Sequence, residues 1–139
     1  MPYFDQATET MPRERLAALQ LQKLQAMLAE LWGKNAFYTA KLKAAGAEPG
    51  DIRALADLCR LPLTAKHELL DDQAAHPPFG ANLTYPLKAY VRYHQTSGTT
   101  GAPLRVLDTH DSWEWWGRCW GFVLSGAGLT ACDRLFSAF

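Results

Sequence analysis

The chain has 139 residues, a length that suits one compact domain or part of a larger one. Its 48% hydrophobic and 20% charged residues are typical of a globular protein, and a formal net charge of zero argues against nucleic-acid or membrane-surface partners. The three cysteines form no CxxC or Cys/His spacing, which argues against a metal site or a disulfide framework. With no signal-peptide pattern and no apolar run of spanning length, we expect a cytoplasmic protein.

The first predicted helix begins near Pro12 and carries leucines at helical spacing along one face. Thr10 is its expected cap, and proline is tolerated in a first helical turn. Gly33 and Asn35 are expected to end this helix. A second helix follows over about residues 37–45 and ends at the next glycine.

Two shorter helices complete a helical region that we assign to residues 1–78. Asp51 is the expected cap of the first of them, and Pro62 stops it. Thr64 is the expected cap of the second, which runs to about residue 75, where two prolines close it.

The pattern changes from residue 79 onward. Residues 79–89 have a loop-like composition, and residues 90–95 then alternate apolar or aromatic with polar side chains, as a strand does. A polar loop at 96–103 and a second short strand at 104–107 complete a hairpin-like unit. We interpret 79–139 as the start of an α/β core.

A tryptophan-rich helix is predicted over about residues 110–124, with Thr109 as its cap. It is apolar on nearly every side, a pattern typical of helices inside a large protein, so we expect it to be buried in a larger protein and to leave apolar surface exposed in this chain. A strand pattern begins at Asp133, and the chain stops within the apolar run 135–139. Because domain boundaries normally fall in polar linkers, this ending predicts a piece of a longer chain.

The loop at 96–103 reads Thr-Ser-Gly-Thr-Thr-Gly-Ala-Pro. Its glycines allow positive φ and close approach of backbone N–H groups to an anion, and its hydroxyls add further donors, so it can cradle phosphates. It is not a Walker loop, because no lysine follows the second glycine. The alternative is a polar hairpin turn that happens to be rich in threonine.

The string T-S-G-T-T-G-x-P resembles the signature loop of the adenylate-forming superfamily, which includes acyl- and aryl-coenzyme A synthetases. Other features resemble its phenylacetate–coenzyme A ligase branch, and the likeness covers nearly the whole chain. Many superfamily members have Lys-Gly after the proline; this chain has Leu104 and Arg105, and the branch lacks that lysine too. The features are the opening Met11-Pro12-Arg13-Glu14-Arg15-Leu16, Asn35-Ala36-Phe37-Tyr38, Leu61-Pro62-Leu63-Thr64 with Lys66, and His94 just before the loop.

The resemblance implies an incomplete α/β fold: a helical N-terminal region, then the first strands and a buried helix of the ligase N-terminal domain. It implies ATP, Mg²⁺ and coenzyme A as substrates of the complete enzyme, a small carboxylic acid (phenylacetate) as the acid, and a possible homodimer. The implied phosphate-binding residues are Thr96, Ser97, Gly98, Thr99, Thr100 and Gly101.

Two further residues are weaker candidates for contact with the acid. His94 could orient the loop or reach the acyl-phosphate region, and the alternative is a strand histidine hydrogen-bonded to backbone. Phe139 resembles by position an aromatic residue of the aryl-acid pocket, and the alternative is plain core. We expect no catalytic residue and no metal ligand within the chain, because the family's later motifs are missing.

Three other readings stay open. The chain could be a non-catalytic helical interaction module with an incidental threonine-rich turn. It could come from another adenylate-forming ligase that acts on a different acid. A nucleotide-binding kinase is the third, and the missing Walker lysine argues against it.

Overall fold

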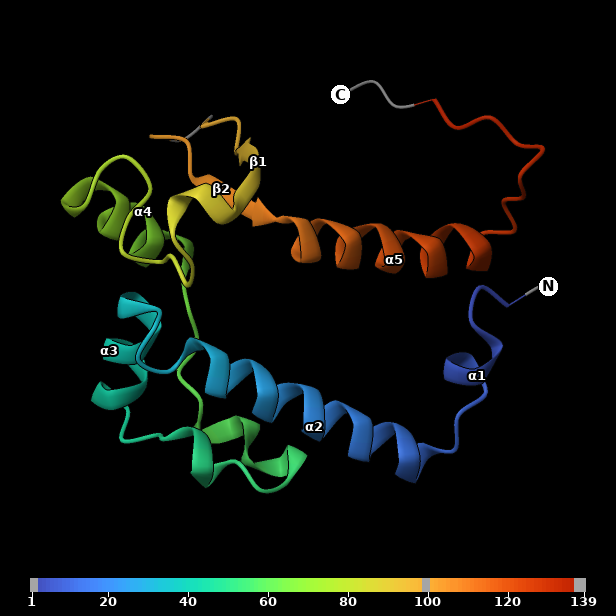
Figure 1. Cartoon of the computed structure of the whole chain (residues 1–139), viewed down its shortest axis with the longest axis horizontal. Helices are drawn as coiled ribbons and strands as arrows, with labels where there is room; N and C mark the ends of the chain where they lie inside the picture. The colour runs from blue at the N-terminus through green and yellow to red at the C-terminus, as the bar shows by residue number, and fades with distance from the viewer. Residues whose placement is uncertain (1–2, 99–100, 137–139) are drawn as a thin grey trace.

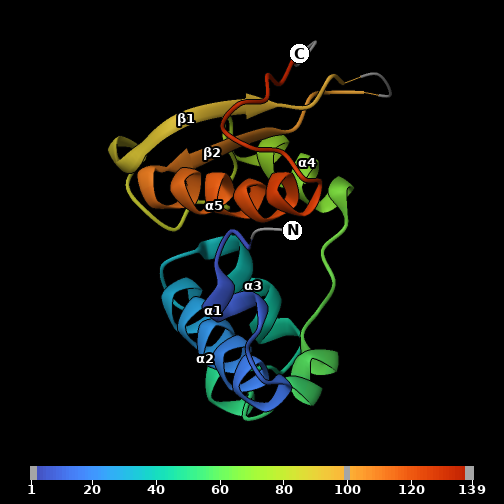
Figure 2. The same ribbon diagram turned by 90° about the vertical axis from the view of Figure 1, so that its right-hand side faces the viewer.

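The computed structural model describes residues 3–98 and 101–136 (Figure 1). Both views place α1 to α3 in one layer, and α4, the two-stranded ribbon and α5 in a second layer (Figures 1 and 2). The elements are α1 (Gln6–Glu9), α2 (Arg13–Leu31), α3 (Ala36–Ala44), the 3-10 turns η1 (Pro49–Asp51) and η2 (Leu55–Arg60), α4 (Lys66–Ala75), a third 3-10 turn η3 (Leu87–Ala89), β1 (Tyr90–Gln95), β2 (Arg105–Thr109) and α5 (His110–Gly126).

A small apolar core lies in the first layer, where the predicted leucine stripe of α2 meets α3 and η1. The fully buried apolar residues of the described chain are Leu28, Leu42, Ala47 and Ile52, with Leu21, Leu24, Trp32 and Leu61 packed around them. The Gln25 side chain adds a polar tie, because its Nε2 donates to the Ile52 carbonyl at 2.8 Å.

Three of the predicted helix caps are wrong. Asp51 is the last residue of η1, and Ala54 is the N-cap of η2. Pro12, not Thr10, is the N-cap of α2, and the Thr10 amide instead donates to the Gln6 carbonyl at the end of α1. Ala65 rather than Thr64 begins α4, and its amide donates to Glu68 at 2.6 Å. A glutamate three residues into the helix has therefore replaced a hydroxyl cap.

The predicted hairpin is confirmed. β1 and β2 pair antiparallel in a register that sets Gln95 opposite Arg105, with an irregularity between Tyr90 and Arg92. The second strand starts one residue later than predicted and continues to Thr109. Thr109 then caps α5 as expected, since its side chain accepts a hydrogen bond from the Ser112 amide.

Helix α5 leaves apolar side chains exposed within this chain, as expected for a helix that packs inside a larger protein. None of its 17 residues, all of them described, is buried. Trp115, Trp116 and Trp120 are 51%, 54% and 46% exposed, and Figure 2 shows α5 along the lower side of the strand ribbon. The strand predicted from Asp133 is absent from 133–136, and the rest of that prediction lies outside the described residues.

The N-terminal arm joins the two layers. The Phe4 ring meets the Phe122 ring edge-on, with centroids 5.0 Å apart, and Asp5 pairs with Arg118 at 2.5 Å. Nearer the start of α5, the Lys23 ammonium of α2 lies over the Trp115 ring, with Nζ 4.1 Å from the ring centroid. Within the described ranges, no helix combines the length and hydrophobicity needed to cross a bilayer.

Candidate functional site

The threonine- and glycine-rich loop leaves the ribbon through one extra pair of residues, Thr96 and Leu104. The Thr96 amide donates to the Leu104 carbonyl at 3.0 Å, and the Leu104 amide donates to the Thr96 hydroxyl at 3.0 Å. A hydroxyl thus takes the place that a carbonyl holds in an ordinary ladder. Thr96 closes the base of the loop with both its backbone and its side chain.

Gly98 has a conformation and a packing that other residues cannot adopt without strain. Its φ is +66°, in the left-handed region. A Cβ placed there would lie 2.9 Å from the Gly101 carbonyl oxygen and 3.3 Å from Cδ of Pro103. The chain therefore folds back on Gly98, and the proline that ends the loop packs against it.

The backbone donors of the loop are not equivalent. The Gly101 amide donates to the Gly98 carbonyl at 3.1 Å, so it closes a turn inside the loop. Among the described residues, nothing accepts a hydrogen bond from the Ser97 or Gly98 amide. Ser97 is exposed and Gly98 half-buried, so this part of the loop is accessible from solvent. Thr99 and Thr100 lie outside the described residues.

His94 lies on β1, just before the loop. Its Nε2 is 3.3 Å from Oδ2 of Asp108, and its ring stacks on Trp113 with centroids 5.4 Å apart. The Arg92 guanidinium lies 4.6 Å from the centroid of the same tryptophan ring. His94 is thus held by side chains of β2 and α5, where we had considered a strand histidine bonded to backbone.

An apolar groove of about 500 Å³ borders His94 and Trp113, with the Trp116 and Cys119 side chains farther along α5. Phe139, the other candidate for contact with the acid, lies outside the described residues. The described part of the chain therefore does not bring the two candidates together.

Arg105, the only cation close to the loop in sequence, is turned toward the α4 side of the ribbon. Its Nη1 donates to the Pro78 carbonyl at 2.9 Å. Its backbone meets the side chain of Gln73 on α4. Sequence reasoning missed Gln73, because a glutamine on a polar helix gives no signal of a partner 32 residues away.

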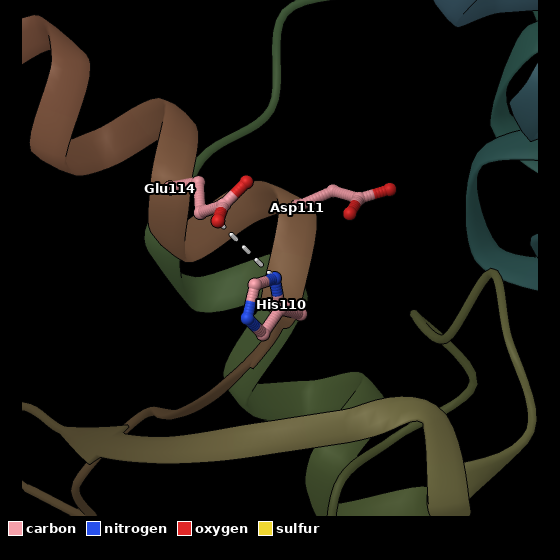
Figure 3. Close-up of side chains that lie close together, drawn as sticks. All are labelled: His110, Asp111 and Glu114. Atoms are coloured by element: carbon pink, nitrogen blue, oxygen red, sulfur yellow. Dashed lines mark ion pairs between the residues drawn. The ribbon is translucent and has the colours of Figure 1, made fainter.

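Only one group of potential metal ligands occurs within the described ranges, at the first turn of α5. His110, Asp111 and Glu114 are all exposed, and their ligand atoms lie within 4.8 Å of one another. Figure 3 shows the His110 ring facing Glu114, with Nδ1 3.6 Å from Oε1, while the Asp111 carboxylate points away. Exposed acidic groups of this kind are common, and we assign no ion to them.

The fold and the loop resemble the N-terminal portion of acid–coenzyme A ligases. The structure matches a 2-hydroxyisobutyryl-coenzyme A ligase, solved in the postadenylation state with its acyl-AMP, with a TM-score of 0.86 and 29% identity. That match covers 99% of this chain and 30% of the ligase. An open form of that enzyme, bound to the acyl-AMP and coenzyme A, matches with a TM-score of 0.83 and 30% identity over 91% of this chain and 29% of the ligase.

Sequence similarity points to one branch of that class. The chain is 36% identical to the phenylacetate-coenzyme A ligase of Thermus thermophilus and 34% identical to that of Escherichia coli, over 131 residues in each case. These alignments cover 94% of this chain but only 28% and 29% of the two ligases. No protein-family model matches the chain. The resemblance stated from the sequence is confirmed, and the fold is that of the N-terminal portion of such ligases.

Proposed function

We propose that this chain supplies the phosphate-binding part of an ATP-dependent acid–coenzyme A ligase. In that reaction a carboxylate attacks the α-phosphorus of ATP, which forms an acyl-adenylate and releases pyrophosphate. The thiol of coenzyme A then attacks the acyl carbon, which forms the thioester and releases AMP. Our proposal assigns to Thr96, Ser97, Gly98, Thr99, Thr100 and Gly101 the binding of the ATP polyphosphate.

The single observation that carries this proposal is the pair of open amides at Ser97 and Gly98. Two successive N–H groups beside a left-handed glycine form the kind of concave donor site that binds phosphate oxygens. The Ser97 hydroxyl and the proton of the Thr96 hydroxyl add donors at the same edge. Such fixed dipoles stabilise the negative charge of a polyphosphate without reorganising when it binds.

Phenylacetate is the acid that we propose, because the curated relatives are phenylacetate-coenzyme A ligases. A second candidate is a small hydroxy acid, since the solved ligases of similar fold carry a 2-hydroxyisobutyryl-adenylate. Magnesium would arrive with ATP; the described loop residues offer it hydroxyls but no carboxylate, so we assign it no protein ligand. We further propose a cytoplasmic location.

The proposal is tested by measuring binding of MgATP and of tripolyphosphate to the chain by ³¹P NMR. We expect both to bind, and adenosine not to bind, because the loop contacts phosphates alone. Gly98→Ala should abolish binding: the left-handed conformation costs a residue with Cβ about 1–2 kcal/mol, and the added atom meets the Gly101 carbonyl.

Gly46→Ala is the matched control. Gly46 has nearly the same φ, +64°, but a Cβ there meets nothing within 4 Å. The Gly46→Ala variant should bind MgATP and tripolyphosphate as the wild type does and keep the same helix content. Failure of the wild-type chain to bind either phosphate compound would refute the proposal. The remaining interpretation would then be the non-catalytic helical interaction module.

Catalysis is a separate matter from binding. We expect the chain alone, mixed with MgATP, phenylacetate and coenzyme A, to release no pyrophosphate above background. Turnover in this mixture would show that residues of this chain carry out steps that we do not assign to it.

A further inference from the structure

The side chain of Gln73, on the last turn of α4, forms two hydrogen bonds with the backbone of Arg105. Its Nε2 donates to the Arg105 carbonyl at 2.6 Å, and its Oε1 accepts from the Arg105 amide at 3.0 Å. One carboxamide therefore satisfies both polar groups of one strand residue, in the way that a residue of a neighbouring strand would.

The position of this contact follows from the ladder. In an antiparallel pair, residues whose N–H and C=O groups point at the partner alternate with residues whose groups point outward. The Thr96 amide donates to Leu104, so the Gln95 and Arg105 pair is of the outward kind. The Arg105 amide and carbonyl face away from β1, toward α4, and Gln73 meets them there.

Asp72, the residue before Gln73, ties the end of α4 to the turn after it. The Asp72 side chain is only 7% exposed, and its Oδ2 accepts hydrogen bonds from the amides of Ala81 and Asn82, at 2.8 and 3.2 Å. The Arg105 guanidinium closes the arrangement by donating to Pro78. The end of α4, the turn after it and the first residue of β2 thus form one hydrogen-bonded unit.

We propose that Gln73 is a positioning residue for the phosphate loop. By holding Arg105, it fixes the strand that carries Leu104, the partner of Thr96 at the base of the loop. It also fixes the approach of Pro103 to Gly98. The Ser97 and Gly98 amides are therefore set in place before a polyphosphate binds. This inference rests on the proposed function of the loop.

Two variants of Gln73 separate its hydrogen bonds from its bulk. Gln73→Met keeps the length of the side chain and removes both bonds, and we expect tripolyphosphate to bind roughly three- to tenfold more weakly. Hydrogen exchange at the Arg105 amide should accelerate by a similar factor. Gln95→Met is the matched control, because Gln95 lies opposite Arg105 and its Oε1 accepts a hydrogen bond from the Tyr93 hydroxyl on the same strand, at 2.6 Å. It should leave both measurements at the wild-type value.

Gln73→Glu provides a rescue that a merely structural residue would not show. At pH 8 its carboxylate accepts from the Arg105 amide but repels the Arg105 carbonyl, so binding should be weakened as in Gln73→Met. Once protonated, the carboxyl group both accepts and donates, as the native carboxamide does. The ratio of its affinity to that of the wild type, each measured at the same pH, should therefore begin to rise at pH 5 and approach one as the pH falls below the ordinary glutamate pKa of about 4.3.

The outcomes distinguish the inference from the function on which it rests. If the wild type binds no tripolyphosphate, the proposed function is refuted and this inference with it. If the wild type binds and Gln73→Met binds equally well, the function stands and the inference is refuted. The inference is also refuted if Gln73→Glu shows no recovery as the pH falls below the ordinary glutamate pKa, or if Gln95→Met weakens binding as much as Gln73→Met.

Discussion

Asn35 and Asn82 are joined by a side-chain hydrogen bond of 2.9 Å between positions 47 residues apart. The same Nδ2 of Asn35 also donates to the Thr84 hydroxyl at 3.1 Å, and its Oδ1 accepts from the Tyr38 amide at the start of α3. Asn35 is 2% exposed. One buried carboxamide therefore caps a helix of the first layer and holds the segment that leads to β1.

Replacing Asn35 should destabilise the whole chain. Asn35→Ala removes the cap and leaves buried groups without partners, so we expect the free energy of unfolding to fall by about 1–3 kcal/mol in urea denaturation. Asn35→Asp keeps the acceptor that caps α3 but cannot donate to Asn82. If the Asn35→Asp variant were as stable as the wild type, the hydrogen bond between Asn35 and Asn82 would contribute nothing to the free energy of unfolding.

Glycines 117 and 121 of α5 should respond in opposite ways to alanine. A Cβ at Gly117 meets nothing within 4 Å, so Gly117→Ala should raise the free energy of unfolding by up to about 1 kcal/mol through helix propensity. A Cβ at Gly121 would overlap the Phe4 ring. In the same denaturation assay, Gly121→Ala should therefore leave the free energy of unfolding unchanged or lower it. Equal gains at both positions would show that the N-terminal arm does not rest on α5.

Acid should weaken the contact between α3 and α4. The Lys41 ammonium, which donates to Glu68, holds the pKa of the Glu68 carboxyl below its usual value of about 4.5, and the Ala65 amide acts in the same direction. A lowered pKa in the folded state gives stability that is present above about pH 4.5 and lost as pH falls through the lower folded value. Glu68→Gln should thus unfold with a shallower dependence on pH between about 5 and 3 than the wild type.

Asp71→Asn is the control for that experiment, because Asp71 is an exposed carboxylate on the same helix. The Asp71→Asn variant should show the same change in the free energy of unfolding with pH as the wild type. A wild-type slope in Glu68→Gln would mean that the ion pair with Lys41 does not contribute to stability.

The exposed tryptophans of α5 should cause self-association. Trp115, Trp116, Trp120 and Val123 are each about half exposed, and contiguous apolar surface of this kind favours association in water. We expect the sedimentation coefficient of the chain to rise with its concentration. Trp120→Lys should reduce that rise.

Leu63→Lys is the control for the tryptophan variant. Leu63 is 94% exposed but lies in the segment before α4, away from the tryptophans. It should leave association unchanged. A wild-type chain that sediments as a single monomer at every concentration would contradict the prediction.

Local patterns in the sequence predicted much of the secondary structure. The leucine spacing, the alternation at 90–95 and Thr109 predicted a helix, a strand and a helix cap from residues a few positions apart. The structure confirms these three elements, although β1 is exposed along nearly its whole length. The loop string also sufficed for the resemblance to coenzyme A ligases. The composition of α5 predicted a helix that packs inside a larger protein and leaves apolar surface exposed in this chain, and Trp115, Trp116 and Trp120 are about half exposed here.

The sequence by itself predicted the helices, the hairpin and a loop whose glycines allow the left-handed conformation that Gly98 adopts. Only the tertiary structure decided which side chains hold these parts together: Asn35 with Asn82, Gln73 with Arg105, and Phe4 on Gly121. The physical reason is the distance along the chain over which each kind of interaction acts. Propensity and capping act within a turn or two of chain, whereas a polar side chain finds a distant partner only after the backbone has brought the two within hydrogen-bonding distance.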